Sequence, residues 1–268
     1  CGDTPLLREE SLEKLIDKHK KEDIALTMLT ADMDNPFGYG RIVKDDIGNV
    51  EEIIEEKEAS DEIKKIKEIN TGVYCCNSKK LFEALEDIDN DNNKGEYYLT
   101  DIIGILNSNG EKIKTLKLED NEEILGVNNR VHLSIATSVL KSRKNIEVME
   151  KGVTLIDPEN TYIEESVQIA QDTVIYPGVV IQGKTKIGNN CKIMGNTRIF
   201  NSEIKNNVNI ESSVIEEAKI KNNAKIGPFA HLRPKADIGE NVKVGNFVEI
   251  KKSTLEKDVK AGHLTYIG

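Results

Sequence analysis

The sequence predicts an α/β domain followed by a parallel β-helix, and two observations carry this prediction. In the second half, isoleucine recurs every six positions from Ile163 to Ile199. In the first half, short apolar segments alternate between helical and extended patterns. The composition changes near the middle of the 268-residue chain, so we expect two domains. The expected parts are residues 1–128 (first domain), 129–151 (linker helix) and 152–268 (β-helix).

The period of six separates the second half from both an α-helix and an ordinary sheet, whose periods are ~3.6 and ~2 residues. A parallel β-helix with three short strands in each coil of ~18 residues has this period. Each strand then supplies one inward aliphatic side chain, and a small residue stands beside each corner. A β-sandwich would instead alternate every two residues and turn every ~8 to 12. The register resumes after a one-residue skip at Ile204, and the seven anchors before it are Ile163, Ile169, Ile175, Ile181, Ile187, Ile193 and Ile199.

The first half contains helix and strand patterns in the order of an α/β domain. No glycine-rich phosphate loop of the G-x-G-x-x-G or Walker type occurs in residues 1–150, so these patterns alone name no reaction. The expected elements are a helix carrying Leu12, Leu15 and Ile16, a strand at 24–30, a hairpin at 41–45 and 50–57, a short helix at 61–68, a strand at 69–75, a helix at 81–85, a helix at 102–106 capped by Thr100, a strand at 112–118 and a long helix from about 130 to 150.

Composition and charge exclude several classes of function. The chain has 37 Lys and Arg against 47 Asp and Glu, a net charge of −10, which disfavours nonspecific binding to nucleic acid or anionic lipid. No apolar segment has membrane-spanning length, and the first residues do not resemble a signal peptide. The cysteines have no metal-ligand spacing, which favours a reduced, cytoplasmic protein. They are Cys1, Cys75, Cys76 and Cys191.

The two ends indicate a fragment of a longer protein. The chain begins with Cys1 rather than methionine, and it stops at Gly268, one residue into a new repeat and without a capping segment. We therefore expect further sequence on both sides.

Eight short strings of glycine, charged and aromatic residues identify a family. In order and spacing they resemble the bacterial bifunctional enzymes that are both N-acetylglucosamine-1-phosphate uridyltransferase and glucosamine-1-phosphate acetyltransferase. The resemblance covers essentially the whole chain. It implies a partial nucleotidyltransferase domain with a Rossmann-like mixed sheet, and a left-handed parallel β-helix of hexapeptide repeats. The strings occupy residues 38–41, 55–57, 69–72, 95–101, 126–130, 227–234, 245–252 and 260–266.

The resemblance implies two reactions of cell-wall precursor synthesis, for peptidoglycan and lipopolysaccharide. Glucosamine 1-phosphate is acetylated by acetyl-CoA in the β-helix, and the product, N-acetylglucosamine 1-phosphate, is joined to UTP in the α/β domain. The products are UDP-N-acetylglucosamine and pyrophosphate. The resemblance also implies Mg²⁺ as cofactor and a homotrimer with acetyl sites between subunits. It implies that the protein binds neither nucleic acid nor a membrane.

For uridylyl transfer, the resemblance implies that Asp3 and Asn128 bind Mg²⁺, which prefers oxygen ligands. Without the resemblance, Glu55 would be interpreted as a solvated surface charge. The positions matched to those that hold the sugar nucleotide are Gly2, Asp3, Gly40, Glu55, Asn70 and Asn128.

For acetyl transfer, the resemblance implies that His263 is the general base, and imidazole titrates near neutrality as this role requires. Arg233 and Lys251 match residues that hold the sugar phosphate, and Tyr266 matches a further substrate-binding position. The motif does not demand histidine at His231, which we interpret as structural or surface.

The chain departs from the family pattern at Glu58, where Asp is usual, and at Lys235, where Gly is usual. It also lacks the upstream nucleotide-binding glycine loop and the downstream CoA-binding coils. We therefore expect that this chain alone completes neither reaction.

Three other functions agree less well with the sequence. A sugar-1-phosphate nucleotidyltransferase with a structural β-helix tail would not need the Gly-His-Leu-Thr-Tyr string at residues 262–266. A metal-dependent β-helix enzyme needs a cluster of histidine ligands, and His231 and His263 are too few. A noncatalytic trimeric scaffold would bind no phosphate ligand.

Overall fold

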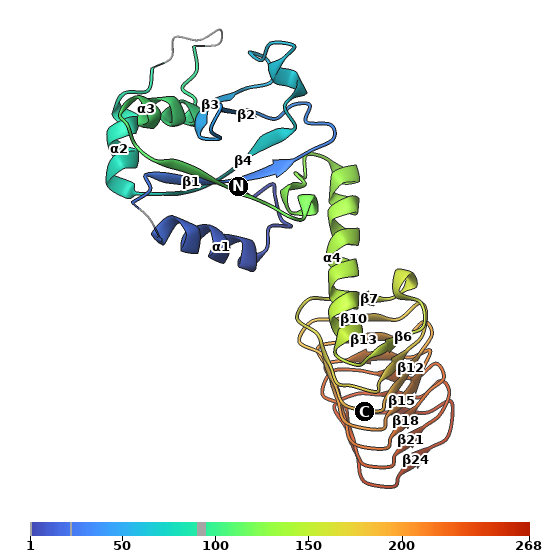
Figure 1. The fold of residues 1–268 in the computed structure, drawn as a ribbon. Coiled ribbons are helices and arrows are strands. Elements are labelled where there is room, and N and C mark those ends of the chain that lie inside the picture. The colour runs from blue at the N-terminus through green and yellow to red at the C-terminus, as the bar shows by residue number, and fades with distance from the viewer. Residues whose placement is uncertain (1, 22, 90–94) are drawn as a thin grey trace. The chain divides into compact units, whose positions relative to one another are not determined.

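The computed structural model describes residues 2–21, 23–89 and 95–268 (Figure 1). Cys1 and Lys94 lie outside the described residues. The chain forms two compact units, Cys1–Ala136 and Thr137–Gly268, which divide inside the long helix α4 (Arg130–Glu150). The expected domain limits at 128/129 and 151/152 stay predictions, because α4 contributes to both units.

A five-stranded mixed sheet forms the centre of the first unit, as the sequence predicts. Its strands are β1 (Leu26–Asp32), β2 (Arg41–Lys44), β3 (Val50–Ile54), β4 (Glu68–Cys76) and β5 (Ile113–Lys117). Their spatial order is β3-β2-β4-β1-β5, in which β1 and β5 run parallel and the other neighbours run antiparallel. The helices are α1 (Glu9–Lys20), α2 (Ser78–Glu86) and α3 (Ile102–Ser108), with single 3-10 turns η1 (Ile63–Lys65), η2 (Leu99–Asp101) and η3 (Asn121–Ile124).

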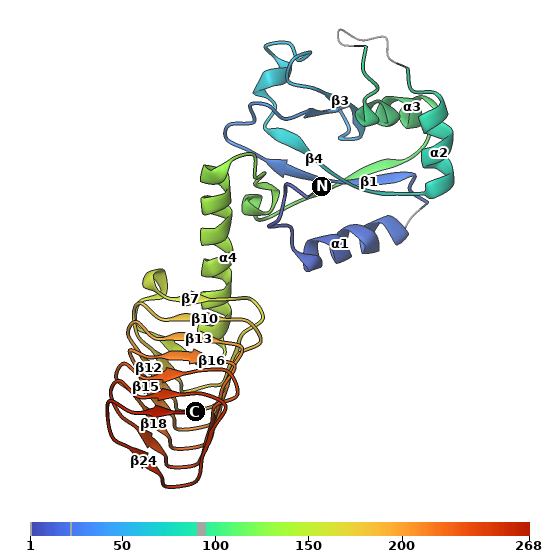
Figure 2. The same ribbon diagram turned by 180° about the vertical axis from the view of Figure 1, so that it is seen from behind.

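Strand β1 is buried on both faces of this sheet. Leu26 and Met28 pack in one core with residues of α2 and α3, whereas Leu29 and Ala31 pack in a second core with Leu15 of α1. A strand covered on both sides has no solvent-facing row of side chains, so the residues of β1 before Asp32 are all buried, Thr27 and Thr30 included. Figures 1 and 2 show α1 on one side of the sheet and α2 and α3 on the other.

Three local predictions were wrong. The helix expected at 61–68 is only the turn η1, because none of its residues is buried and helix growth needs an apolar face. The second hairpin arm ends at Ile54 instead of residue 57. Thr100 does not cap α3, since it lies inside η2 and the amide of Ile102 is already bonded to the carbonyls of Leu99 and Thr100.

The second unit is a parallel β-helix, as the period of six predicts. Figures 1 and 2 show the stacked coils. Its strands are β6 (Thr154–Leu155), β7 (Tyr162–Ile163), β8 (Gln168–Ile169), β9 (Val174–Ile175), β10 (Val180–Gln182), β11 (Lys186–Ile187), β12 (Lys192–Met194), β13 (Arg198–Phe200), β14 (Glu203–Ile204), β15 (Asn209–Glu211), β16 (Val214–Glu216), β17 (Lys219–Ile220), β18 (Lys225–Ile226), β19 (His231–Leu232), β20 (Asp237–Ile238), β21 (Lys243–Val244), β22 (Glu249–Ile250), β23 (Thr254–Leu255), β24 (Lys260–Ala261) and β25 (Tyr266–Ile267), with a 3-10 turn η4 at Pro158–Asn160.

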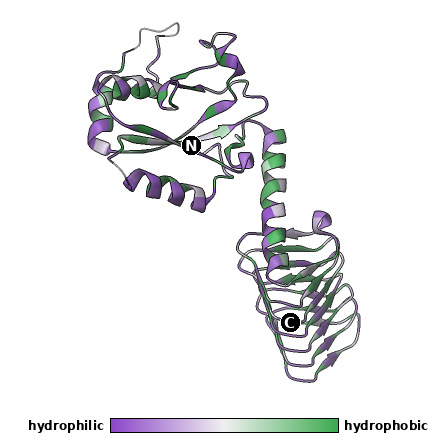
Figure 3. Ribbon diagram, viewed as in Figure 1, coloured by the Kyte–Doolittle hydropathy of each residue, from purple (hydrophilic) through white to green (hydrophobic). Residues whose placement is uncertain are grey.

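The coils place every third strand in the same sheet. The three sheets have the orders β25-β22-β19-β16-β13-β10-β7, β23-β20-β17-β14-β11-β8 and β24-β21-β18-β15-β12-β9-β6. Each inward anchor pairs with the anchor one coil away, for example Ile181 with both Ile163 and Ile199. Figure 3 shows hydrophobic and hydrophilic residues alternating along the coils. The unbroken column of anchors is therefore the core of this unit.

The corners of the coils adopt left-handed backbone conformations. Among the described residues, Asn or Asp supplies eight of the fifteen non-glycine residues with positive φ, because their short polar side chains tolerate this region. Lys235 has φ +68°, which gives a physical reason for the glycine that is usual there.

The end of α4 closes the first coil. Asn145 Nδ2 donates to the carbonyls of Pro158 and Thr161 at 2.8 and 3.2 Å, and Val148 joins the core of anchors. No helix among the described residues is both long and apolar enough to cross a membrane.

Candidate functional sites

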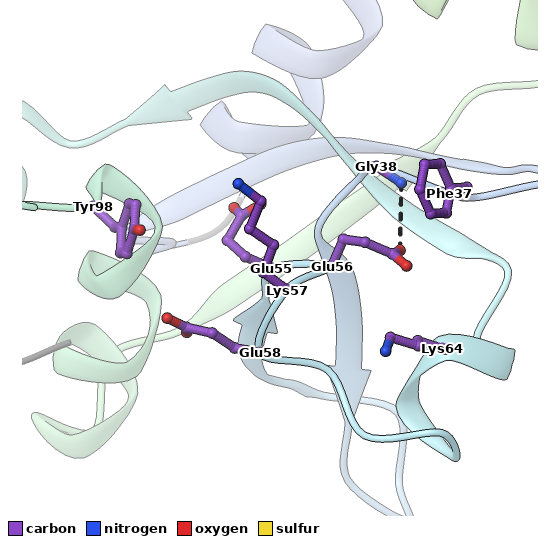
Figure 4. A pocket seen from close by; sticks show the side chains of 8 residues that line it. All are labelled: Phe37, Gly38, Glu55, Glu56, Lys57, Glu58, Lys64 and Tyr98. Atoms are coloured by element: carbon purple, nitrogen blue, oxygen red, sulfur yellow. Dashed lines mark hydrogen bonds between the residues drawn. The ribbon is translucent and has the colours of Figure 1, made fainter. Parts of the chain in front are cut away.

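A cleft of about 510 Å³ opens in the first unit beside the end of β3 (Figure 4). The segment that follows β3 and the glycine loop that precedes β2 form one wall, and Tyr98 lies on the other side. Both signs of charge meet here with aromatic rings, a mixture that suits a polar ligand with a ring. The lining residues are Phe37, Gly38, Glu55, Glu56, Lys57, Glu58, Lys64 and Tyr98.

Arg41 is bonded to both segments of this wall. Its side chain is only 2% exposed, and its Nη2 lies 2.6 Å from Glu56 Oε2. Nη1 donates to the carbonyl of Tyr39, and the amide of Gly38 donates to Glu56 at 3.3 Å. Burial acts to raise the pKa of Glu56, but the hydrogen bonds from Arg41 and Gly38 lower it on balance. Glu56 is thereby kept as a carboxylate that ties the glycine loop to the segment after β3.

Gly40, Glu55 and Asn70 meet at one place, although they are far apart in the sequence. The amide of Asn70 donates to the carbonyl of Gly40 at 2.9 Å. A Cβ atom on Gly40 would lie 3.3 Å from Glu55 Oε1 and 2.9 Å from Ile53 Cγ2, so only glycine leaves this space open. Glu55 is half-buried in this arrangement, unlike a freely solvated surface charge.

Tyr74 joins this group, although no residue pattern indicated it. Its hydroxyl donates to Asn70 Oδ1 at 3.0 Å. Burial raises the pKa of Tyr74 above its usual value, the bond to Asn70 opposes this, and the charge of Glu55 adds to the rise. Lys57, Lys64 and Tyr98 were also not assigned, although Lys57 and Tyr98 stand inside the recognised strings. Their place in the cleft depends on loop conformation, which the residue pattern does not reveal.

Asp3 and Asn128 belong to two neighbouring segments. The amide of Val127 donates to the carbonyl of Asp3 at 2.7 Å, and a Cβ atom on Gly126 would lie 3.7 Å from Asn128 Nδ2 and 3.9 Å from the Asp3 carbonyl oxygen. Gly2 stands in the same exposed turn as Asp3. The described chain holds no group of three or more His, Cys, Asp and Glu that could bind a metal. A cation bound by Asp3 and Asn128 would have one carboxylate and one amide oxygen from these two residues, a donor set that fits Mg²⁺.

In the β-helix, Arg233, Lys251 and Tyr266 lie along one sheet. The amide of Arg233 donates to the carbonyl of Ile250, and the amide of Lys251 donates to the carbonyl of Ile267. The two basic residues therefore occupy equivalent positions of neighbouring coils. Tyr266 pairs with Glu249 across β25 and β22.

Glu249 holds the guanidinium of Arg233. Arg233 Nη1 lies 2.7 Å from Glu249 Oε1. This hydrogen bond lowers the pKa of Glu249 and raises that of Arg233, so both groups remain charged. His231, which we interpreted as structural or surface, pairs through Nε2 with Glu216 Oε2 at 2.9 Å. Arg233 and His231 are thus each oriented by a carboxylate on the neighbouring strand.

His263 lies in the exposed turn before β25 rather than in the sheet itself. The amide of the next residue, Leu264, donates to Asn246 at 3.1 Å, which fixes the turn against the previous coil. A Cβ atom on Gly245 would overlap the carbonyl oxygen of Gly262. The glycine at 245 therefore allows the coil that carries His263 to stack.

Two family models match the chain. The model described as Nucleotidyl transferase matches residues 2–160. The model described as Bacterial transferase hexapeptide (six repeats) matches residues 166–201 and 217–252. The first match covers more than half of the chain, and the second falls within the β-helix.

Curated relatives carry the name Bifunctional protein GlmU. The chain is 52% identical to the one from Geobacillus sp. (strain WCH70) over 268 residues, which is 100% of this chain and 58% of that protein. It is 48% identical to the one from Halalkalibacterium halodurans, over 100% of this chain and 59% of that protein. It is 50% identical to the one from Enterococcus faecalis, over 100% of this chain and 58% of that protein. The chain therefore belongs to the nucleotidyl transferase family, carries a bacterial transferase hexapeptide β-helix, and is homologous to a continuous stretch of somewhat under two thirds of the bifunctional GlmU proteins.

Proposed function

We propose that this chain is part of an enzyme that makes UDP-N-acetylglucosamine by two successive transfers. The first moves an acetyl group from acetyl-CoA to glucosamine 1-phosphate. The second joins N-acetylglucosamine 1-phosphate to UTP and releases pyrophosphate. The observation that carries the proposal is the meeting of Gly40, Glu55 and Asn70 beside the cleft, in a chain about half identical to bifunctional GlmU proteins over its whole length.

In the first unit, the cleft residues bind and orient the sugar nucleotide. The Glu55 carboxylate accepts hydrogen bonds from sugar hydroxyls, and the Asn70 amide makes a further polar contact. The open space at Gly40 lets the ring approach the backbone. Asp3 and Asn128 would hold Mg²⁺, which when bound neutralises phosphate charge. Gly2 would support the nucleotide from the same turn.

In the β-helix, His263 takes a proton from the substrate amine, which attacks the carbonyl carbon of the acetyl thioester. The carbon–sulfur bond then breaks, and the thiolate of CoA leaves and is protonated. Arg233 and Lys251 hold the sugar phosphate, the first through a two-pronged contact and the second as a point charge. Glu249 keeps Arg233 in place. Tyr266, on the adjacent strand, makes a further substrate contact.

Assembly and location complete the proposal. The enzyme would be a homotrimer with acetyl sites between subunits, acting in cell-wall precursor synthesis. The described cysteines, Cys75, Cys76 and Cys191, are free thiols, which supports a reducing, cytoplasmic setting.

The test measures release of CoA thiol by the full-length protein that contains this chain, with glucosamine 1-phosphate and acetyl-CoA. We expect release that depends on the amino sugar and falls about 10²-fold or more in His263→Ala, the usual size of general-base catalysis. The matched control is His231→Gln, which changes the other histidine of this region while keeping a donor for Glu216. Undiminished release in His263→Ala would contradict the role of the base.

Absence of release from a folded trimer would favour the runner-up, a sugar-1-phosphate nucleotidyltransferase with a structural β-helix. Pyrophosphate release from UTP and N-acetylglucosamine 1-phosphate by the same sample then identifies that enzyme. If neither product forms, the noncatalytic scaffold is the remaining hypothesis. Calorimetry with UDP-N-acetylglucosamine then shows whether the cleft binds this ligand.

A further inference from the structure

Strand β4 contains a bulge beside the cleft. Met28 of β1 pairs with Tyr74, whereas Thr30 pairs with Asn70, so two steps along β1 face four steps along β4. Gly72, in the middle of the bulge, has φ +74°, which glycine adopts without strain. Thr71 Oγ1 donates to the carbonyl of Leu29 at 2.8 Å and secures the bulge to β1. Bulges of this kind often redirect side chains next to active sites.

The bulge lies between Asn70 and Tyr74. In a regular strand, residues four apart are separated by ~13 Å along the strand. Here the Tyr74 hydroxyl lies 3.0 Å from Asn70 Oδ1. The two side chains therefore meet across the irregular part of β4.

Two donors occupy the carbonyl oxygen of the Asn70 side chain. The amide of Gly72 donates to Oδ1 at 3.0 Å, and the Tyr74 hydroxyl is the second donor. A backbone amide cannot accept a hydrogen bond, so the side-chain atom that faces Gly72 must be the oxygen. Both lone pairs of Oδ1 are then used. Within the described part of the chain no acceptor is bonded to Asn70 Nδ2, which leaves its two N–H groups for a ligand.

We propose that Tyr74 is a positioning residue that fixes the Asn70 side chain as a hydrogen-bond donor toward the bound sugar nucleotide. The ligand atom opposite Asn70 must then be an acceptor oxygen, from a hydroxyl or a carbonyl group. Glu55, as a carboxylate, accepts only, so the pair distinguishes donor from acceptor groups on one sugar. This inference rests on the function proposed above.

The first arm of the test needs no ligand. Nuclear magnetic resonance of protein labelled with ¹⁵N-asparagine records the side-chain amide of Asn70, assigned with Asn70→Ala. We expect a rigid, well-dispersed pair of signals in the parent chain and a mobile, less dispersed pair in Tyr74→Phe, which keeps the ring and loses only the hydroxyl. The control is Tyr176→Phe in the β-helix. Equal mobility of the Asn70 amide in parent and Tyr74→Phe would overturn the proposal.

The second arm is a double-mutant cycle on the binding of UDP-N-acetylglucosamine to the full-length protein, measured by calorimetry. We expect Tyr74→Phe to weaken binding about three- to tenfold, the worth of one hydrogen bond. In an Asn70→Ala background, Tyr74→Phe should have no further effect, because it acts only through Asn70. Additive losses would show that Tyr74 touches the ligand or supports the cleft by packing, and would overturn the positioning role. A parent protein that does not bind the sugar nucleotide would refute the proposed function, while the first arm still decides the contact between Tyr74 and Asn70.

Discussion

At the scale of single residues, the missing side chain of Gly40 leaves space open beside Glu55. We expect Gly40→Ala to weaken UDP-N-acetylglucosamine binding about tenfold or more, because the new methyl group would press on Glu55 Oε1 and on Ile53. Calorimetry with the full-length protein measures this change in affinity.

The matched control is Gly104→Ala in α3, where a Cβ atom meets nothing within 4 Å. That change should leave binding unaltered and stabilise the protein by ~0.5 to 1 kcal/mol. Equal affinities for parent and Gly40→Ala would argue against sugar binding at this position.

The thiol of Cys76 gives a pH-dependent prediction at the same scale. Burial, with a smaller contribution from Cys75, raises the pKa of Cys76 from 9.0 to about 11. Between pH 9 and about 11, the Cys76 thiol therefore keeps its proton in the folded protein and loses it in the unfolded chain. This contribution to stability is complete below pH 9 and disappears as the pH rises from about 9 to 11. We expect the free energy of unfolding to fall more steeply over this range in the parent than in Cys76→Ala, as urea titrations at each pH would show. Parallel curves for the two proteins would contradict the raised pKa.

The candidate site was only partly predictable from residues. Strings around Gly40, Glu55 and Asn70 identify the family, and the structure brings these three together. Tyr74 could not be predicted, because its contact with Asn70 spans the bulge at Gly72, which no residue pattern indicates. A pattern of apolar and polar residues records which face of a regular strand is buried and contains no information about an irregular step.

At the scale of elements, the inward anchors of the β-helix should dominate its stability. Ile226 and Lys225 are neighbours in β18, the first buried and the second exposed. We expect Ile226→Ala to cost ~2 to 5 kcal/mol, because neighbouring anchors cannot close the cavity. Lys225→Ala should change stability by no more than ~0.5 kcal/mol. Hydrogen exchange of the β-helix amides measures both, and similar effects of the two changes would refute an anchor-based core.

Regularity decided which elements the sequence predicts well. Every anchor from Ile163 to Ile199 repeats the same environment, so one period describes the whole β-helix. The first unit offers no such repetition. Its expected helix at 61–68 contains Ile63 and Ile66 at helical spacing, yet both are only partly buried and only η1 forms. Tertiary burial, which is not written in the local pattern, decides such short elements.

At the scale of the whole molecule, each unit closes its own hydrophobic core. We expect two unfolding transitions in calorimetry. UDP-N-acetylglucosamine should raise the unfolding temperature of the first unit alone. At a concentration of ~100 times its dissociation constant, it should increase the free energy of unfolding of that unit by ~2.7 kcal/mol. Leu29→Ala, in the first core, should lower that same transition and provides the assignment. A single transition that moves as a whole with ligand would contradict separate cores.

The stacking of Arg233 on Lys251 has a consequence for how such a site can change over time. Because their backbones occupy equivalent places on adjacent turns of the β-helix, their separation is set by the pitch of the coil, ~4.8 Å, and not by any loop. An amino-acid substitution at either position changes the charge of the side chain, but it leaves the spacing of the coils unchanged. Charges carried at this position of successive coils are therefore separated by whole multiples of the coil spacing.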